Sequence, residues 1–212
     1  MQAYKDHFAD KNFALSFLSG ALLLIISLIM QFVASNYATN SASDSVTDVV
    51  LSNTRVYDVG GVFVWGAVIL LVIGLCIGFS RVNRLPFFMK SVALFTLIRS
   101  VFVSLTHISP FPTHALITST FFQHSFFNGV FNGDDLFFSG HTGLPFLFAL
   151  LFWHNKRLRF LFLGFSITFA VVVLLGHLHY SIDVLAAYFI TYSIFDLCKF
   201  LFKEDWKLFL KK

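Results

Sequence analysis

His179 and Asp183 are the residues whose types and spacing most directly suggest chemistry. Residues four apart lie on one face of a helix, so the Asp183 carboxylate could accept a hydrogen bond from one ring nitrogen of His179. The other ring nitrogen would then be available as a nucleophile or base, as in catalytic triads. The same spacing also suits a hydrogen bond that only stabilises the helix, so the pair alone does not decide between these roles.

A second polar cluster, Ser139-Gly140-His141, stands where an apolar stretch begins. The free N–H groups and the dipole of a helix start favour a phosphate, and Ser139 could cap that helix or donate to a phosphate oxygen. Arg99 lies inside another apolar stretch, and its guanidinium could bind the remaining phosphate oxygens. Asp135 could orient His141 or hold a headgroup amine.

The composition shows what kind of protein must position these residues. Of the 212 residues, 57% are hydrophobic and 12% are charged, whereas a soluble domain carries about 25% charged residues. This excludes a soluble enzyme, a disordered chain and a secreted disulfide scaffold, and leaves an integral membrane protein. Cys76 and Cys198 both lie in apolar stretches and are expected to be buried thiols.

Six stretches are apolar over about the 20 residues that a membrane-spanning helix needs. We therefore predict an all-α fold, a single membrane domain over residues 1–212 with six transmembrane helices. The predicted spans are 13–34, 59–79, 87–108, 137–153, 160–178 and 180–202.

The basic residues are sorted by side in this arrangement. All of the 15 Lys and Arg residues except Arg55 and Arg99 lie in the two tails and in the second and fourth connections. The positive-inside rule then predicts that the N and C termini are both cytoplasmic. Because this sorting explains the basic isoelectric point, no nucleic-acid partner is expected, and the polar clusters fall on the opposite, non-cytoplasmic side.

Ionisable groups near spanning helices are functional candidates, because the bilayer penalises them. Each one here also has a structural alternative: a helix cap for Ser139, a polar contact for a histidine, and snorkelling for Arg99. Their coincidence on the side that lacks Lys and Arg favours a catalytic site for a phosphate ester. No metal ion and no cofactor are expected, because no third ligand at matched spacing accompanies the two histidines.

The sequence also predicts the nature of two connections and of the C-terminal tail. Residues 35–58 form a polar loop, and the C-terminal tail is either a short interfacial helix or a solubilising terminus. The third connection holds His107, His114 and His124 among many phenylalanines, and could shape a lipid entrance or form an interfacial aromatic belt.

The two clusters resemble motifs of a known family. Ser139-Gly140-His141 is similar to the second motif, and His179 with Asp183 to the third, of the type 2 phosphatidic-acid phosphatase superfamily. The resemblance is closer to its sphingomyelin-synthase-like branch, whose motifs read Gly-Asp-x-x-Phe-Ser-Gly-His-Thr and His-Tyr-Ser/Thr-x-Asp-Val-x-x-Ala-Tyr. The corresponding segments here are 135–142 and 179–188, and a fainter similarity covers 99–112.

This resemblance implies a mechanism. His179 would attack the phosphorus, Asp183 would orient it, and His141 would protonate the departing alcohol oxygen, with a phosphohistidine-type intermediate between the two half-reactions. We expect substrate contacts from Arg99, Ser139, Gly140, Asp135, Tyr180 and His177.

Two phosphate-binding cations of the classical phosphatases are missing. Their first motif reads Lys-x6-Arg-Pro, but here Lys90 and Arg99 are nine apart and Lys90 is predicted at the cytoplasmic end. Val173 stands where the third motif has an arginine. Because a dianionic monoester needs more positive charge than a monoanionic diester, this favours a phosphodiester headgroup such as phosphocholine or phosphoethanolamine.

The sequence therefore predicts a lipid phosphotransferase or phosphatase that acts on a phospholipid headgroup, with a lipid alcohol or water as acceptor. The alternatives are a phosphatase that converts phosphatidic acid to diacylglycerol, and a non-catalytic lipid-binding protein of the same fold. The expected location is a bacterial inner membrane with the site facing the periplasm, or a eukaryotic membrane with a luminal or extracellular site.

Overall fold

The structure is a computed structural model that describes residues 8–115 and 136–211. Within these residues it is helical and contains no strand, as predicted. The α-helices are α2 (Lys11–Asn40), α3 (Gly60–Phe79), α4 (Leu85–Leu105), α6 (Gly140–Leu151), α7 (Lys156–Leu175), α8 (Ser181–Leu201) and α9 (Lys203–Leu210). Two short 3-10 helices, Leu51–Asn53 and Val82–Arg84, lie in connections.

Five of the helical segments are long and apolar enough to cross a membrane. They are α2, α3, α7, α8 and the segment Val82–Leu105, which contains α4. Each of them overlaps a predicted span. The predicted span 137–153 instead contains α6, which has only 12 residues. At 1.5 Å per residue it is about 18 Å long, against about 30 Å for the hydrocarbon core, so the count of six spans is not confirmed.

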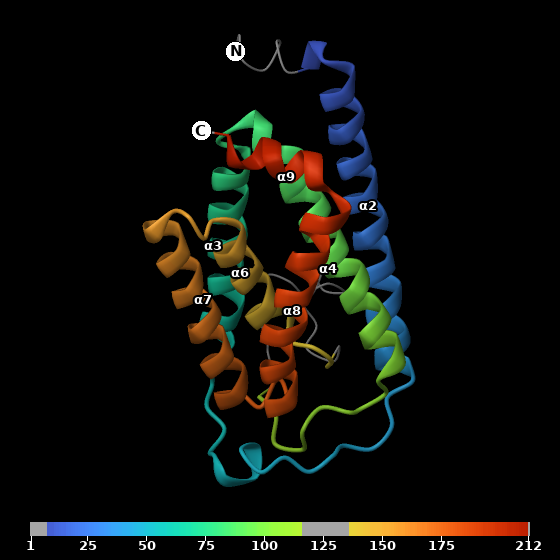
Figure 1. The fold of residues 1–212 in the computed structure, drawn as a ribbon. Coiled ribbons are helices and arrows are strands. Elements are labelled where there is room, and N and C mark those ends of the chain that lie inside the picture. The colour runs from blue at the N-terminus through green and yellow to red at the C-terminus, as the bar shows by residue number, and fades with distance from the viewer. Residues whose placement is uncertain (1–7, 116–135, 212) are drawn as a thin grey trace.

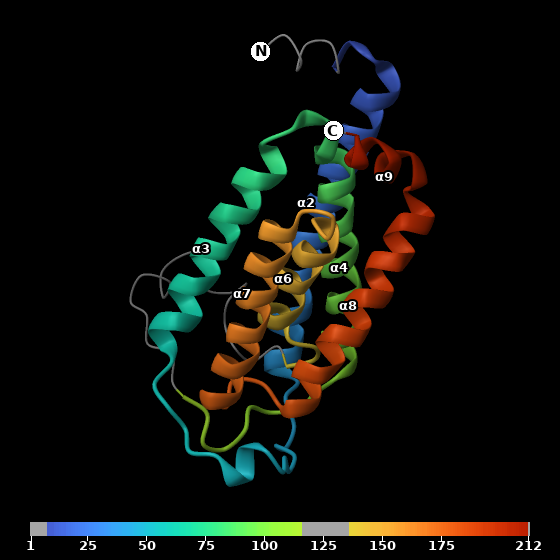
Figure 2. The same cartoon turned by 60° about the vertical axis from the view of Figure 1, so that its left-hand side comes forward.

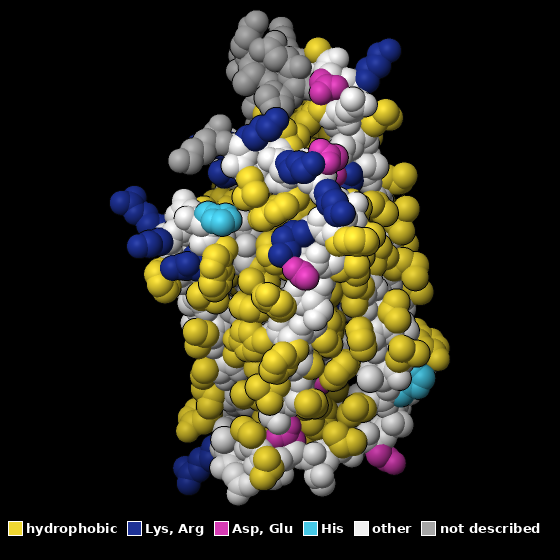
Figure 3. Space-filling model, in the orientation of Figure 1, with side chains coloured by type: hydrophobic (Ala, Val, Ile, Leu, Met, Phe, Trp, Pro, Cys, Tyr) yellow, Lys and Arg dark blue, Asp and Glu magenta, His cyan; other side chains and the backbone are white. Residues whose placement is uncertain are grey.

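The helices form an elongated bundle in which α6 is the most enclosed (Figures 1 and 2). Helices α2 and α4 pack along their length on one side, while α6 contacts α7 and α8. The outward side chains of α2, among them Leu22, Ile25 and Ile29, are exposed. Hydrophobic side chains cover most of the visible flank (Figure 3), which is what a lipid-facing surface requires.

The interior is built largely from phenylalanine rings around α6, and a glycine allows the helices to approach. A Cβ on Gly143 would lie 2.8 Å from Oγ1 of Thr191 in α8 and 2.9 Å from the ring of Phe95 in α4. Any side chain there would push the three helices apart. Gly143 thus sets the depth at which α6 begins between its neighbours.

The two ends of the bundle differ in charge, and α9 lies at only one of them. Helix α2 begins, and α9 ends, at the same end (Figure 1), where Lys and Arg side chains gather (Figure 3). Of the two alternatives for the C-terminal tail, the structure shows the helix, α9, whose Phe209 is buried against Phe87 of α4. Helix α8, which follows His179, begins at the opposite end, and α6 begins inside the bundle on the side of that end.

The first loop is shorter than the polar segment that the sequence predicted. Helix α2 continues to Asn40, so the first six residues of the expected polar segment are helical. No proline or glycine interrupts residues 35–40, and the helix therefore runs past its apolar window. The rest of the loop contacts the start of α8 through Asp48.

Candidate active site

The predicted His179–Asp183 pair is present at the turn from α7 into α8. Oδ2 of Asp183 accepts from Nδ1 of His179 at 3.4 Å and from the backbone N–H of Tyr180 at 2.9 Å. His179 is 4% exposed and Asp183 2%. The carboxylate thus caps α8 and orients the imidazole, which leaves Nε2 as the ring nitrogen that can act on a substrate.

The N-terminus of α6 docks directly on this pair. The backbone N–H of Ser139 donates to the carbonyl oxygen of Asp183 at 3.2 Å. Oγ of Ser139 caps α6 by accepting from the N–H of Thr142 at 3.4 Å. A single hydrogen bond therefore joins the start of α6 to the turn that carries His179 and Asp183.

Arg99 comes to the same place from α4. It is buried, and its Nε donates to the carbonyl oxygen of Phe138 at 3.0 Å. A Cβ on Gly140 would lie 3.0 Å from this Nε, so the glycine gives the guanidinium room to approach the start of α6 closely. The structure thus brings together Arg99, Ser139, Gly140 and Asp183, as the sequence predicted.

His141 leaves the first turn of α6 toward α3 and α7. Its ring stacks on Phe63 with centroids 3.9 Å apart and meets the edge of Phe169 at 5.5 Å. Phe63 belongs to a buried apolar cluster that includes Leu178 and Val184, the neighbours of His179 and Asp183 in the chain. That the imidazoles of His141 and His179 act on one phosphorus atom stays a prediction.

His177 makes contacts that hold loops together. Its backbone has φ 52°, and the side chain is buried. Nε2 lies 3.3 Å from Oγ1 of Thr54, and Nδ1 lies 2.7 Å from Oγ1 of Thr113. Both ring nitrogens are therefore engaged by hydroxyls of the first and third connections. Burial lowers the pKa of His177, although the nearby Asp48 carboxylate partly raises it.

Tyr180 has a similar setting. Its hydroxyl donates to the carbonyl oxygen of Ser109 at 2.8 Å and accepts the backbone N–H of Val46 at 3.2 Å. Burial raises its pKa. The polar atoms of His177 and Tyr180 thus bind loops near the His179–Asp183 pair. From the sequence we expected both residues to contact substrate and did not predict these loop contacts.

Asp48 is the site residue that the sequence reasoning missed. Its Oδ2 accepts the N–H of Ser181 at 2.7 Å, and its Oδ1 accepts from Val50 and Leu51. Although burial raises the pKa of Asp48, hydrogen bonds led by that from Ser181 hold it below its ordinary value. No periodicity or motif marks an aspartate in a serine-rich loop, so only the fold could reveal this contact.

The remaining predicted residues are less informative. Asp135 and His124 lie outside the described residues. Rings of His107 and His114 contact carbonyl oxygens three residues back in their own segment. Among residues 8–115 and 136–211, no group of three or more His, Cys, Asp or Glu side chains could hold a metal ion.

The segment that carries both histidine clusters matches a known family. Residues 133–200 match the family model described as PAP2 superfamily C-terminal. The match runs through α6, α7 and nearly all of α8, and so contains Ser139, His141, His179 and Asp183. It supports the type 2 phosphatidic-acid phosphatase superfamily and, with it, a membrane protein of phosphatase or phosphotransferase type. No curated protein and no solved structure gave a significant match.

Proposed function

We propose that this chain is a membrane lipid phosphotransferase or phosphatase, similar in activity to the sphingomyelin-synthase-like branch, with His179 as its nucleophile. We propose six membrane-crossing segments: the five long helical segments and the short helix α6. Both termini would then be cytoplasmic, and the active site would face the non-cytoplasmic side. The observation that carries the proposal is the hydrogen bond from Ser139 N–H to the Asp183 carbonyl. It joins the α6 N-terminus to the His179–Asp183 pair.

The first half-reaction would transfer the phosphoryl headgroup to the enzyme. Nε2 of His179 attacks phosphorus, an N–P bond forms, and the P–O bond to the diacylglycerol breaks. Asp183 keeps Nδ1–H directed and stabilises the positive charge that develops on the ring. His141 gives its proton to the departing oxygen.

The second half-reaction would reverse these roles. A lipid alcohol or water gives its proton to His141 and attacks phosphorus, and the N–P bond to His179 breaks. The phosphoryl oxygens would lie against the N–H groups at the start of α6 and the guanidinium of Arg99, which favour the charge of the transition state. Arg99 is already fixed there by Phe138.

The positions of two other residues support a phosphodiester headgroup as substrate. Lys90, which we did not count as a phosphate ligand from the sequence, is paired with Asp205 of α9 at 2.7 Å. Val173 is buried in an apolar cluster. With Arg99 as the described cation at this site, a monoanionic diester such as a phosphocholine or phosphoethanolamine lipid is matched better than a dianionic monoester.

The activity can be tested with purified protein in detergent. It would be given labelled phosphatidylcholine, phosphatidylethanolamine and phosphatidic acid, each with and without diacylglycerol or ceramide. We expect headgroup release or transfer from a diester, and His179→Ala should abolish it. His154→Ala, which changes an exposed histidine at the other end of the bundle, is the matched control. Full turnover by His179→Ala would disprove the assignment of the nucleophile.

The orientation has a separate test. A tag placed after Lys212 should be accessible only from the cytoplasm. Cys76 is exposed, contrary to the expectation of a buried thiol, whereas Cys198 is buried. In a Cys76→Ala background, Ser45→Cys in the exposed first loop should react with a membrane-impermeant thiol reagent from outside. Labelling of both positions from the same side would contradict the proposed topology.

A further inference from the structure

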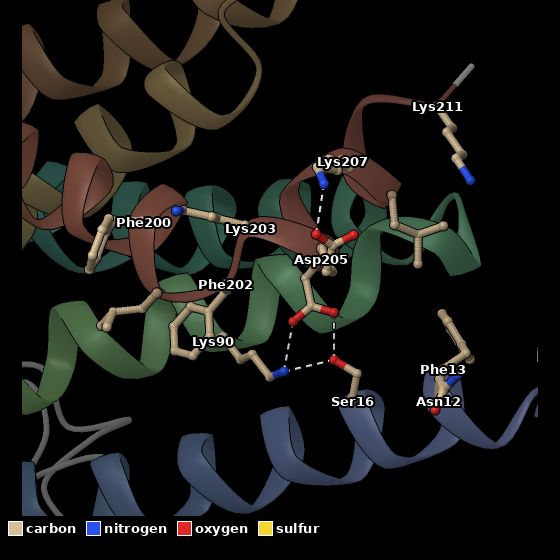
Figure 4. Close-up of a pocket in the computed structure, with 13 residues that line it drawn as sticks. Asn12, Phe13, Ser16, Lys90, Phe200, Phe202, Lys203, Asp205, Lys207 and Lys211 are labelled. Carbon is tan, nitrogen blue, oxygen red and sulfur yellow. Dashed lines mark hydrogen bonds and ion pairs between the residues drawn. The ribbon is translucent and has the colours of Figure 1, made fainter.

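A groove of about 750 Å³ lies at the opposite end of the bundle from His179, between the N-terminal turns of α2 and the helix α9 (Figure 4). Asn12, Phe13 and Ser16 of α2 form one wall. The last residues of α8 and one face of α9 form the other, and Lys90 of α4 lies between them. The groove thus combines apolar side chains with polar groups from α2, α4 and α9.

A partly buried triad of Lys90, Ser16 and Asp205 holds the groove together. Nζ of Lys90 donates to Oδ2 of Asp205 and to Oγ of Ser16, each at 2.7 Å, and Ser16 donates to Oδ1 of Asp205 at 2.5 Å. The ring of Phe202 lies 5.2 Å from the ammonium. Because a buried ammonium needs a compensating carboxylate, this triad fixes α9 onto α2 and α4 and is the frame of the groove.

The rim of the groove is basic. Lys203 and Lys207 of α9, and Lys211 directly after it, recur every four residues and are exposed, and Figure 4 shows them along the side of the groove that α9 forms. Lys207 pairs with Glu204 at 2.7 Å. Counting the whole lining, four lysines face two carboxylates, so the groove carries an excess of positive charge and suits an anion.

The walls indicate what kind of anion fits. Phe200 is 66% exposed and Leu201 51%, and both lie at the end of the spanning helix α8, where acyl chains would begin. Basic pockets between transmembrane helices bind acidic lipid headgroups, and lysine side chains can reach such headgroups from the interface. A soluble phosphate would use the lysines but would gain nothing from these apolar side chains.

We propose that this groove binds an acidic phospholipid of the adjacent leaflet. Its acidic headgroup lies along the row of lysines between Lys203 and Lys211, and its acyl chains lie along Phe200 and Leu201. The site is separate from the proposed active site, since its residues come from α2, α9 and the opposite ends of α4 and α8. Lipid bound here joins α9 to the start of α2.

Native mass spectrometry of the full chain tests this proposal without an activity measurement. Delipidated protein in detergent is mixed with equal amounts of phosphatidylglycerol and phosphatidylcholine, and the ratio of bound lipids is measured. We expect phosphatidylglycerol to be preferred, and Lys203→Gln with Lys211→Gln to reduce the preference by at least about tenfold. Asn12→Trp, which fills the rim without changing charge, should reduce it too.

The matched control is Lys156→Gln with Arg157→Gln. These exposed residues begin α7 at the same end of the bundle but do not line the groove, and the charge removed is the same. The preference should survive in this control. The proposal is overturned if wild-type protein shows no preference, if both double variants lose it equally, or if excess inorganic phosphate displaces the lipid completely.

Discussion

Asp48 and Ser181 are joined by a hydrogen bond of 2.7 Å between the Asp48 carboxylate and the Ser181 backbone N–H, across 133 residues of sequence. Ser181 is the first residue of α8, so the first loop directly supports the helix that carries Asp183. The same carboxylate closes the 3-10 turn at Leu51. The loop is therefore part of the frame of the site.

Replacing Asp48 should weaken both the fold and the site. Asp48→Ala leaves three backbone N–H groups without their acceptor, which costs about 1–3 kcal/mol for each buried group that stays unpaired. We expect a lower midpoint of thermal unfolding and a loss of turnover of up to about 100-fold, because the start of α8 shifts. Asp44→Ala, in the exposed part of the same loop, should change neither. Equal behaviour of the two variants would show that the contact is dispensable.

Asp183→Asn should separate the effect of Asp183 on His179 from its role as the cap of α8. The amide oxygen can still accept the Tyr180 N–H, so α8 keeps its cap, but the side chain no longer stabilises a positive imidazole. By analogy with carboxylates in catalytic triads, kcat should fall by about 100-fold to 10,000-fold with a small change in KM. Asp196→Asn, on the exposed face of α8, is the control. A variant with normal kcat would leave the pair with only a helix-stabilising role.

Gly143→Ala should disturb the bundle where α6 enters it. The new methyl group would clash with Thr191 and Phe95, and overpacking of this kind costs about 1–3 kcal/mol. Gly164→Ala in α7 is the matched control, because nothing lies within 4 Å of its Cβ position. Thermal unfolding in detergent should show a lower midpoint for the first variant and an unchanged or higher one for the second. A normal midpoint for Gly143→Ala would mean that the helices can move apart without cost.

The parts of the fold that the sequence predicts are those set by local patterns. Apolar windows located every long helix, and a four-residue spacing predicted the His179–Asp183 contact, because both depend only on neighbours in the chain. The approach of Arg99 to Gly140 agrees with the expectation that both contribute to one phosphate site, which rested on the gathering of ionisable groups on one side of the membrane. Each of these predictions needed no knowledge of the loops.

The parts that the sequence could not predict are long-range contacts and helix ends. The partners of His177 are hydroxyls of two separate connections, Thr54 and Thr113, and no local signal pairs them. Helix α6 begins only at the Ser139 cap, so hydropathy alone overestimated its length. Lys90 was predicted at the same end as the C-terminal tail, but its pairing with Asp205 depends on how α9 folds back.

His177 should make the fold sensitive to mild acid. Burial depresses its pKa in the folded protein, whereas the unfolded chain protonates near the ordinary histidine value of about 6.5. Above that pH both states are neutral and its contribution to stability is fully present. As the pH falls below about 6.5, the unfolded state takes up a proton that the folded state resists, and stability falls by at most about 1.4 kcal/mol per pH unit.

Thermal unfolding at about pH 7.5, 6.5 and 5.5 would measure this effect. His177→Asn tolerates the positive φ and does not titrate in this range, so its midpoint should be lower at neutral pH but should depend less on pH. His154→Gln, an exposed histidine at the other end of the bundle, should retain the wild-type slope. The Asp48 carboxylate titrates at lower pH because its pKa is held down, so it does not mimic the effect. A wild-type slope in His177→Asn would mean that another group is responsible.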